Sequence, residues 1–113
     1  MSLTTSHLDG TAVITVSGDL DIRSAPQLNK TVEKLLKPGL ARMIIDFSDI
    51  TYIDSSGMGT LVSCFKHAQS NQTTFGLASV SGRVCDLLKL TRLQGFFPLY
   101  SNLEEAMEQM EHP

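Results

Sequence analysis

The chain has 113 residues, a length that predicts one domain spanning 1–113 with a core large enough to fold without disulfides or metal ions. Hydrophobic residues make up 42% and charged residues 19%, which is typical of a globular protein and excludes a disordered one. The net charge of −3 lacks the basic surplus that nucleic-acid binding requires. No apolar run is long enough to cross a membrane and no secretory signal opens the chain, so we expect a cytoplasmic protein.

The first segments predict a β-hairpin. Residues 2–8 are a candidate strand, Asp9-Gly10 is a hairpin signal, and the β-branched run 12–16 is expected to be the paired strand. Residues 18–21 are expected to form a turn or loop.

A helix and a buried strand are predicted next. Ser24 is a candidate N-cap, and apolar side chains follow at helical spacing until Pro38-Gly39 ends the helix. The run 43–47 is apolar on successive residues, which is typical of a central strand buried on both faces. Residues 48–54 are expected to be a loop.

A second helix is predicted to start near Asp54 or Ser55. Its apolar residues form one stripe: Met58, Leu61, Val62, Phe65 and Ala68. Residues 74–78 predict another strand, and residues 81–89 predict a short helix.

The last segments predict a short strand at 96–100 and a final helix. Ser101 is its expected cap, with Glu104 completing a capping box. The predicted order is ββαβαβαβα, an α/β fold with a mixed, mostly parallel sheet and packed helices.

Cysteines and histidines give no sign of a metal or redox site. Cys64 and Cys85 show no C-x-x-C spacing, and reduced, mostly buried thiols are expected. The three histidines fall in separate segments without metal-ligand spacing. Glycine motifs of nucleotide-binding enzymes are missing as well, so we expect no metal and no cofactor.

The segment 49–59 is the most informative, because it joins a buried strand to a helix, where α/β proteins build their sites. Asp54 can accept backbone N–H bonds as an N-cap. Glycine costs a helix about 1 kcal/mol relative to alanine, so glycines in a first turn suggest that another group comes close to this backbone. This first helical turn contains two serines and two glycines: Ser55, Ser56, Gly57 and Gly59.

A tight strand–helix connection with capping serines explains the same residues and stays open as an alternative. A hydrolase nucleophile is disfavoured because the G-x-S-x-G motif is absent and no base is placed beside the serines. A phosphate-binding helix start is disfavoured because Asp54 would repel the anion and no lysine or arginine accompanies it.

The run 44–59 resembles the signature of STAS domains, specifically bacterial anti-sigma factor antagonists, through Asp54-Ser55-Ser56-Gly57-Met58-Gly59. Gly18-Asp19-Leu20-Asp21 resembles an early turn of that family, and residues 81–91 and 101–106 resemble its later helices. The resemblance covers nearly the whole chain and implies a single STAS domain.

The resemblance implies a switch without an active site of its own. Ser55 would be the phosphoacceptor. The unphosphorylated protein would bind an anti-sigma factor with a serine kinase domain and so free a sigma factor. Phosphorylation of Ser55 by that kinase would switch the protein off, and a serine phosphatase would restore it. No membrane or nucleic-acid partner is implied, and a monomer is expected when the protein is free.

The resemblance also implies a partner-binding surface around Ser55. Asp54 would orient the hydroxyl or simply cap the helix, and Ser56 would be structural or a contact. The following residues would let the partner approach, with Met58 divided between core and interface. The expected partner-binding residues are Asp21, Asp54, Ser56, Gly57, Met58 and Gly59.

Other members with this fold suggest a second class of function. An accessory subunit of a transporter or a stressosome-like scaffold shares the fold, but such domains often lack the phosphorylatable turn or carry a further domain. A small enzyme would need a base near Ser55, which the sequence does not supply.

Overall fold

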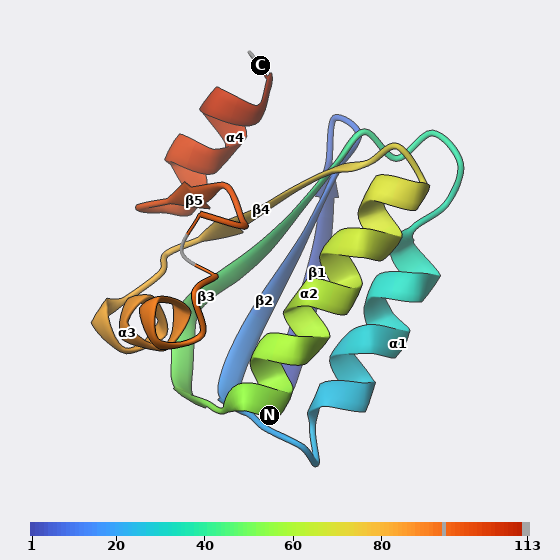
Figure 1. Cartoon of the computed structure of the whole chain (residues 1–113). Helices are drawn as coiled ribbons and strands as arrows, with labels where there is room; N and C mark the ends of the chain where they lie inside the picture. The colour runs from blue at the N-terminus through green and yellow to red at the C-terminus, as the bar shows by residue number, and fades with distance from the viewer. Residues whose placement is uncertain (94, 112–113) are drawn as a thin grey trace.

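The hairpin at the start of the chain forms one edge of a five-stranded sheet (Figure 1). The computed structural model describes residues 1–93 and 95–111. Their elements follow the predicted order ββαβαβαβα: β1 (Ser2–Leu8), β2 (Thr11–Leu20), α1 (Ala25–Leu35), β3 (Arg42–Ile53), α2 (Ser55–Ser70), β4 (Thr74–Ala78), α3 (Gly82–Leu90), β5 (Leu99–Tyr100) and α4 (Leu103–Glu111). The sheet order is β1-β2-β3-β4-β5. The β1–β2 pair is antiparallel and the other pairs are parallel, which confirms the mixed, mostly parallel sheet.

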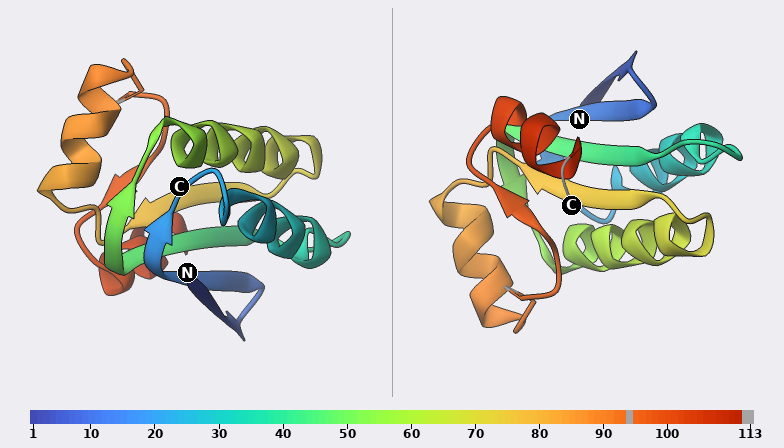
Figure 2. Two further views of the ribbon diagram at one scale, coloured as in Figure 1. Left: turned by 90° about the horizontal axis from the view of Figure 1, so that it is seen from below. Right: turned by 90° about the horizontal axis from the view of Figure 1, so that it is seen from above.

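Two layers of helices enclose the sheet. Helices α1 and α2 cover one face, and α4 lies on the other face (Figures 1 and 2). The central strand explains both layers, because its alternate side chains enter different clusters. Met43, Ile45 and Phe47 join the large core beneath α1 and α2, whereas Ile44 joins a smaller cluster beneath α4. This confirms a strand buried on both faces.

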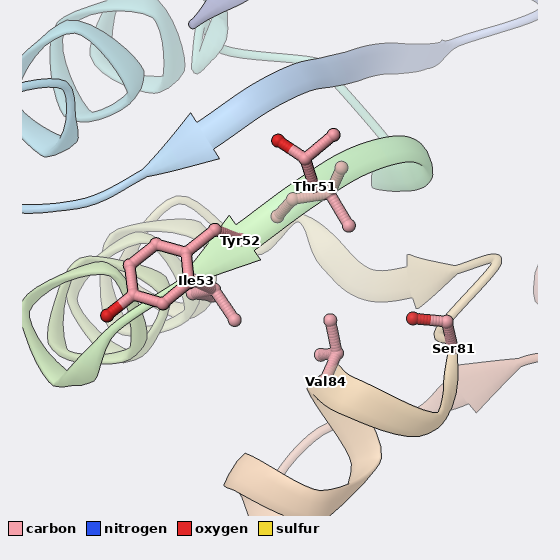
Figure 3. Close-up of a pocket in the computed structure, with 6 residues that line it drawn as sticks. Thr51, Tyr52, Ile53, Ser81 and Val84 are labelled. Atoms are coloured by element: carbon pink, nitrogen blue, oxygen red, sulfur yellow. The ribbon is translucent and has the colours of Figure 1, made fainter.

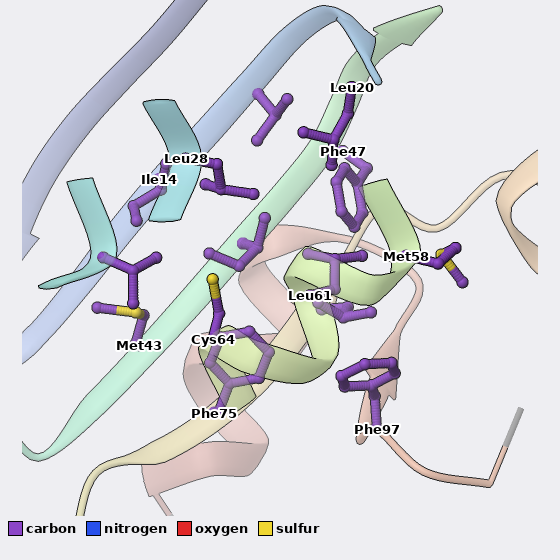
Figure 4. Close-up of a cluster of buried hydrophobic side chains, with 14 of the residues drawn as sticks. Ile14, Leu20, Leu28, Met43, Phe47, Met58, Leu61, Cys64, Phe75 and Phe97 are labelled. Carbon is purple, nitrogen blue, oxygen red and sulfur yellow. The ribbon is translucent and has the colours of Figure 1, made fainter. Parts of the chain in front are cut away.

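The large core depends on the apolar stripe of α2 (Figure 4). Met58, Leu61, Cys64 and Ala68 are buried as predicted, while Val62 and Phe65 are partly buried against the same core. The Phe65 ring lies edge-on to Phe75 of β4, with 5.8 Å between ring centroids. These contacts hold α2 against the sheet along its whole length.

Strands β2 and β3 are longer than predicted. Residues 18–20 and 48–53, expected to be turn or loop, continue the β2–β3 pairing as far as Leu20 opposite Ile53. Register shifts follow Thr15 and Gly18, and each shift breaks the alternation of side chains that marks a strand in sequence. Since β4 pairs with β3 only as far as Asp46, the ends of β2 and β3 extend past the rest of the sheet.

The last strand and the last cap also differ from prediction. Strand β5 has two residues, because Phe96 and Phe97 pack against Phe65 of α2 at 4.9 and 5.7 Å between centroids. The α4 cap is Asn102, one residue later than predicted: its Oδ1 accepts the Glu105 N–H at 2.7 Å. The Glu105 carboxylate accepts the N–H of Ser101, the residue before the cap, so Glu105 takes a role similar to the one predicted for Glu104.

Candidate functional site

The candidate site lies where the projecting ends of β2 and β3 meet the start of α2. The Asp54 N–H donates to the Leu20 carbonyl at 3.3 Å, joining the two strand ends across the turn. The backbone of Asp54 is extended, and its Oδ1 accepts the Gly57 N–H at 2.9 Å. Asp54 is therefore the N-cap of α2, as predicted, and the position of the helix start is fixed from two sides.

Ser55 is the first residue of α2, and its side chain is exposed. Within the described residues its hydroxyl has no hydrogen-bond partner, whereas Ser56 is half-buried beside it. The Ser55 hydroxyl lies at the N-terminal end of the helix, where the unpaired backbone N–H groups favour negative charge. The turn thus presents one accessible hydroxyl that can accept a charged group without losing an internal contact.

Gly57 is required by the fold rather than by a partner. A Cβ atom at this residue would lie 2.5 Å from the Leu20 carbonyl oxygen and 2.9 Å from Cγ1 of Ile53. The close approach suggested by the sequence is therefore made by the end of β2. Met58 is 1% exposed and belongs to the core, so the expectation that it is shared with an interface is corrected. Its side chain lies on the helix face that packs against the sheet.

Gly59 differs from Gly57, because it is exposed and a Cβ atom there would meet nothing within 4 Å. No packing constraint within the described residues demands glycine at this helical position. A glycine that costs helix stability without a packing reason fits the prediction that a partner approaches the backbone beside Ser55.

Asp21 follows Leu20 directly and so lies on the predicted rim, but its carboxylate serves its own loop. Oδ1 of Asp21 accepts the N–H groups of Arg23 and Ser24 at 3.0 and 3.2 Å, and Oδ2 lies 3.5 Å from the Arg23 guanidinium. Partial desolvation is the largest single influence and raises the pKa of Asp21. The two backbone hydrogen bonds and the Arg23 charge together outweigh it, so the pKa lies below its ordinary value. Asp21 is therefore charged at neutral pH.

The Ser24 hydroxyl completes this loop instead of capping α1. It accepts the Asp21 N–H at 2.9 Å and donates to the Asp19 carbonyl at 2.8 Å. Ser24 occupies the predicted N-cap position, but its side chain makes no capping bond to the helix. The β2–α1 connection is thus braced by its own side chains next to the start of α2.

Exposed apolar residues beside the turn were missed as site residues. Tyr52 is 48% exposed and Leu90 is 80% exposed. They border an open groove between the end of β3 and α3, which we call the β3–α3 groove, lined by Tyr52, Ile53, Asp86, Leu87 and Leu90. A smaller adjoining pocket lies between Ile53 and Val84, and the Tyr52 ring points away from it (Figure 3). No local sequence pattern marks this groove, because it depends on where α3 lies beside the end of β3.

Ile22 adds a third exposed apolar side chain on the other flank of the rim. It lies in the β2–α1 connection and is 72% exposed. Figure 1 shows this connection and the β3–α2 turn at the same end of the sheet. Large exposed apolar residues on both sides of an accessible hydroxyl are typical of a protein-binding surface.

Two further properties bear on the class of site. No group of three or more histidine, cysteine or acidic side chains in the described residues could hold a metal ion. None of the helices in that part of the chain has the length and apolar character needed to cross a membrane. The predicted separation of the histidines includes His112, which lies outside the described residues.

These features define a small α/β domain that presents a serine on a rigid strand–helix turn. The STAS domain family model matches residues 2–106, and the chain belongs to that family. An anti-sigma-B factor antagonist of Listeria monocytogenes is 31% identical over 104 residues, covering 91% of this chain and 86% of the relative.

Solved structures share the fold. The anti-sigma factor antagonist SpoIIAA of Bacillus superimposes in its unphosphorylated form with a TM-score of 0.75 and 18% identity, covering 99% of this chain and 100% of SpoIIAA. Its phosphorylated form superimposes with a TM-score of 0.74 and 20% identity, covering 96% and 98%. A sulfate transporter family protein from Wolinella succinogenes gives a TM-score of 0.78 at 17% identity, covering 90% of this chain and 85% of that one. At these identities the likeness concerns the fold alone.

Proposed function

We propose that this protein is an anti-sigma factor antagonist that is controlled by phosphorylation of Ser55. In the unphosphorylated state it binds an anti-sigma factor with serine kinase activity and thereby frees a sigma factor. The observation that carries the proposal is the exposed Ser55 hydroxyl, which has no internal partner in the described residues, at the start of a firmly capped helix. The similarity to the Listeria antagonist supports the same role.

The protein acts as a substrate and a switch rather than as an enzyme. The Asp54 carboxylate next to Ser55 is already engaged by the Gly57 N–H, and Ser55 has no base as a hydrogen-bond partner in the described residues. A kinase supplies the base and the nucleotide, and a phosphatase removes the phosphate. The chain itself supplies the geometry that presents the acceptor hydroxyl.

Phosphorylation acts on the interface and leaves the fold unchanged. A phosphate adds about −1.5 to −2 charges, which the positive end of the helix dipole tolerates. At ~5 Å from one acidic partner group and an effective dielectric of ~20, repulsion is about 3 kcal/mol per unit charge, or roughly a hundredfold in affinity. The capping bond of Asp54 and the packing of Gly57 do not involve the Ser55 hydroxyl, so both persist.

The partner surface combines apolar contact with negative charge. Ile22 is exposed in the β2–α1 connection and Tyr52 near the end of β3, and Leu90 borders the β3–α3 groove. Asp21 and Asp54 contribute carboxylates to the rim. A complementary kinase surface therefore presents apolar side chains, and steric exclusion by the phosphate adds to its repulsion from an acidic partner group.

A direct test is affinity capture from a lysate of the source cell in the presence of Mg-ADP, with tagged wild-type, Ser55→Ala and Ser55→Asp proteins. Mass spectrometry identifies the captured proteins. We expect the wild type and Ser55→Ala to recover a small serine kinase that Ser55→Asp does not. Ser70→Asp is the matched control, because it adds the same charge at the opposite, exposed end of α2, about 20 Å away.

The outcomes separate the two classes of function. Loss of the kinase with Ser55→Asp but not with Ser70→Asp supports the switch. Equal recovery of the kinase by Ser55→Asp contradicts the charge-repulsion mechanism. Recovery of a transporter subunit by every variant favours an accessory subunit of a transporter, and makes Ser55 an ordinary helix-start serine.

A further inference from the structure

His67 lies in the last turn of α2 with one ring nitrogen unpaired. The residue is half-buried, and its Nδ1 is the one buried side-chain nitrogen or oxygen atom without a hydrogen-bond partner in residues 1–93 and 95–111. A buried polar atom without a partner destabilises the fold that contains it. A state of the chain that gives this nitrogen a partner is therefore favoured.

The acidic group nearest to this nitrogen comes from the neighbouring helix. An open pocket between the two helices is lined by Glu33 and Leu36 on one side and by His67 and Asn71 on the other. The Glu33 carboxylate lies close enough to α2 to contribute to the raised pKa of the Cys64 thiol, and Cys64 precedes His67 by one turn on the same helix face. No ion pair joins Glu33 to His67 in this conformation, but Glu33 is exposed and its side chain is free to turn into the pocket.

Both helix ends at this pocket favour a positive charge. Helices α1 and α2 lie side by side and run in the same direction, so their C-terminal ends are neighbours (Figure 1). The unpaired carbonyl groups of a helix C-terminus attract cations. A protonated His67 would therefore be stabilised by the end of its own helix, by the end of α1 and by the Glu33 carboxylate.

The other titratable groups near His67 have a weaker influence. Lys34 and Lys37 on the α1 side and Lys66 on α2 oppose a further positive charge, but all three are exposed and none lines the pocket, so solvent screens them. Burial is the main cause that raises the pKa of the Cys64 thiol to about 12, so this group stays neutral. Glu33 is therefore the charged partner that this pocket offers to His67.

We propose that His67 and Glu33 form a pH-dependent clasp between α2 and α1. When His67 is protonated, its Nδ1–H donates to the Glu33 carboxylate across the pocket, and loss of the proton opens the contact. A histidine in an unfolded chain takes up its proton near pH ~6.5. Because the clasp exists only in the folded chain, it stabilises the fold fully below that pH and is lost as the pH rises above it. The inference does not rest on the proposed function, since the clasp lies at the end of α2 opposite Ser55.

The test measures urea unfolding of the full chain at about pH 5.5 and about pH 8, on either side of the usual histidine range. The variants are His67→Gln, Glu33→Gln and the double variant, which remove the charges and keep side chains of similar size. His7→Gln is the matched control, because it removes another histidine at an exposed position of β1. Circular dichroism checks that every variant folds like the wild type.

We expect the lower pH to raise the folding equilibrium constant of the wild type about fivefold relative to that of His67→Gln. In chains that carry Glu33→Gln the same comparison should give only about twofold, because the helix ends alone remain. His7→Gln should follow the wild type at both pH values.

Two results would overturn the clasp. If the wild type loses stability relative to His67→Gln at the lower pH, burial of the ring outweighs the attraction of Glu33 and the helix ends. If the gain is equally large with and without Glu33→Gln, His67 acts on the helix end and Glu33 is not its partner.

Discussion

Gly57→Ala tests the physical account of the turn most sharply. The added methyl group would lie 2.5 Å from the Leu20 carbonyl oxygen, where about 3.5 Å is needed, so a backbone group must move by about 1 Å. That carbonyl also accepts the Asp54 N–H, so the shift weakens the bond that joins the two strand ends. Overpacking of this kind costs about 1–3 kcal/mol, and the weakened hydrogen bond adds up to about 1 kcal/mol. The helix propensity of alanine returns about 1 kcal/mol, which leaves a net loss of about 2 kcal/mol.

Gly59→Ala is the matched control, because the same chemical change meets open space. Here only the helix propensity counts, and we expect a gain of up to about 1 kcal/mol. Thermal unfolding should place Gly57→Ala roughly 8 °C below the wild type and Gly59→Ala up to roughly 4 °C above it. Equal melting temperatures for the two variants would show that Gly57 is not needed by the packing at the end of β2.

The remaining predictions concern the cap, the partner surface and the buried thiol. Asp54→Ala should lower the free energy of unfolding by about 1 kcal/mol, whereas Asp54→Asn, which still caps the helix, should change it by only a few tenths of a kcal/mol. Urea unfolding measures both values, and equal losses in the two variants would argue against capping. Gly59→Ala should bind the captured kinase more weakly despite its stable fold, and unchanged affinity in calorimetry would remove the interface role of Gly59. Burial, with a smaller contribution from Glu33, raises the pKa of the Cys64 thiol to about 12. Since the unfolded chain loses this proton near pH 8.5, unfolding free energy should fall as the pH rises from about 8.5 towards 12. The fall should be shallower in Cys64→Ala, and identical slopes would contradict the assignment.

Periodic hydrophobic patterns accounted for most of the fold. Met43, Ile45 and Phe47 of β3 and the stripe of α2 contribute to the large core, and Ile44 to the smaller cluster, as the spacing predicts. The cap at Asp54 was also readable, because it depends only on local backbone geometry within four residues. Such features can be predicted because the residues that determine them are close together in the sequence.

Features that depend on contacts between residues far apart in the sequence could not be predicted from it. The bulges in the second half of β3 hide the continuation of that strand, because each added residue reverses the alternation of side chains. Gly57 suggested that another group lies close to the backbone of the turn. That group is the Leu20 carbonyl of β2, a strand much earlier in the sequence, which the sequence alone does not identify. The exposure of Tyr52 and Leu90 likewise depends on where α3 lies beside β3, which no local pattern specifies.

The central claim is that Ser55 is the single phosphate acceptor on an otherwise unchanged domain. The most direct measurement incubates the protein with the captured kinase and Mg-ATP, then maps the phosphate by mass spectrometry of peptides from the wild type and Ser55→Ala. We predict one phosphate on the wild-type chain, at Ser55, and none on Ser55→Ala. Phosphate at Ser56, or undiminished labelling of Ser55→Ala, would contradict the account.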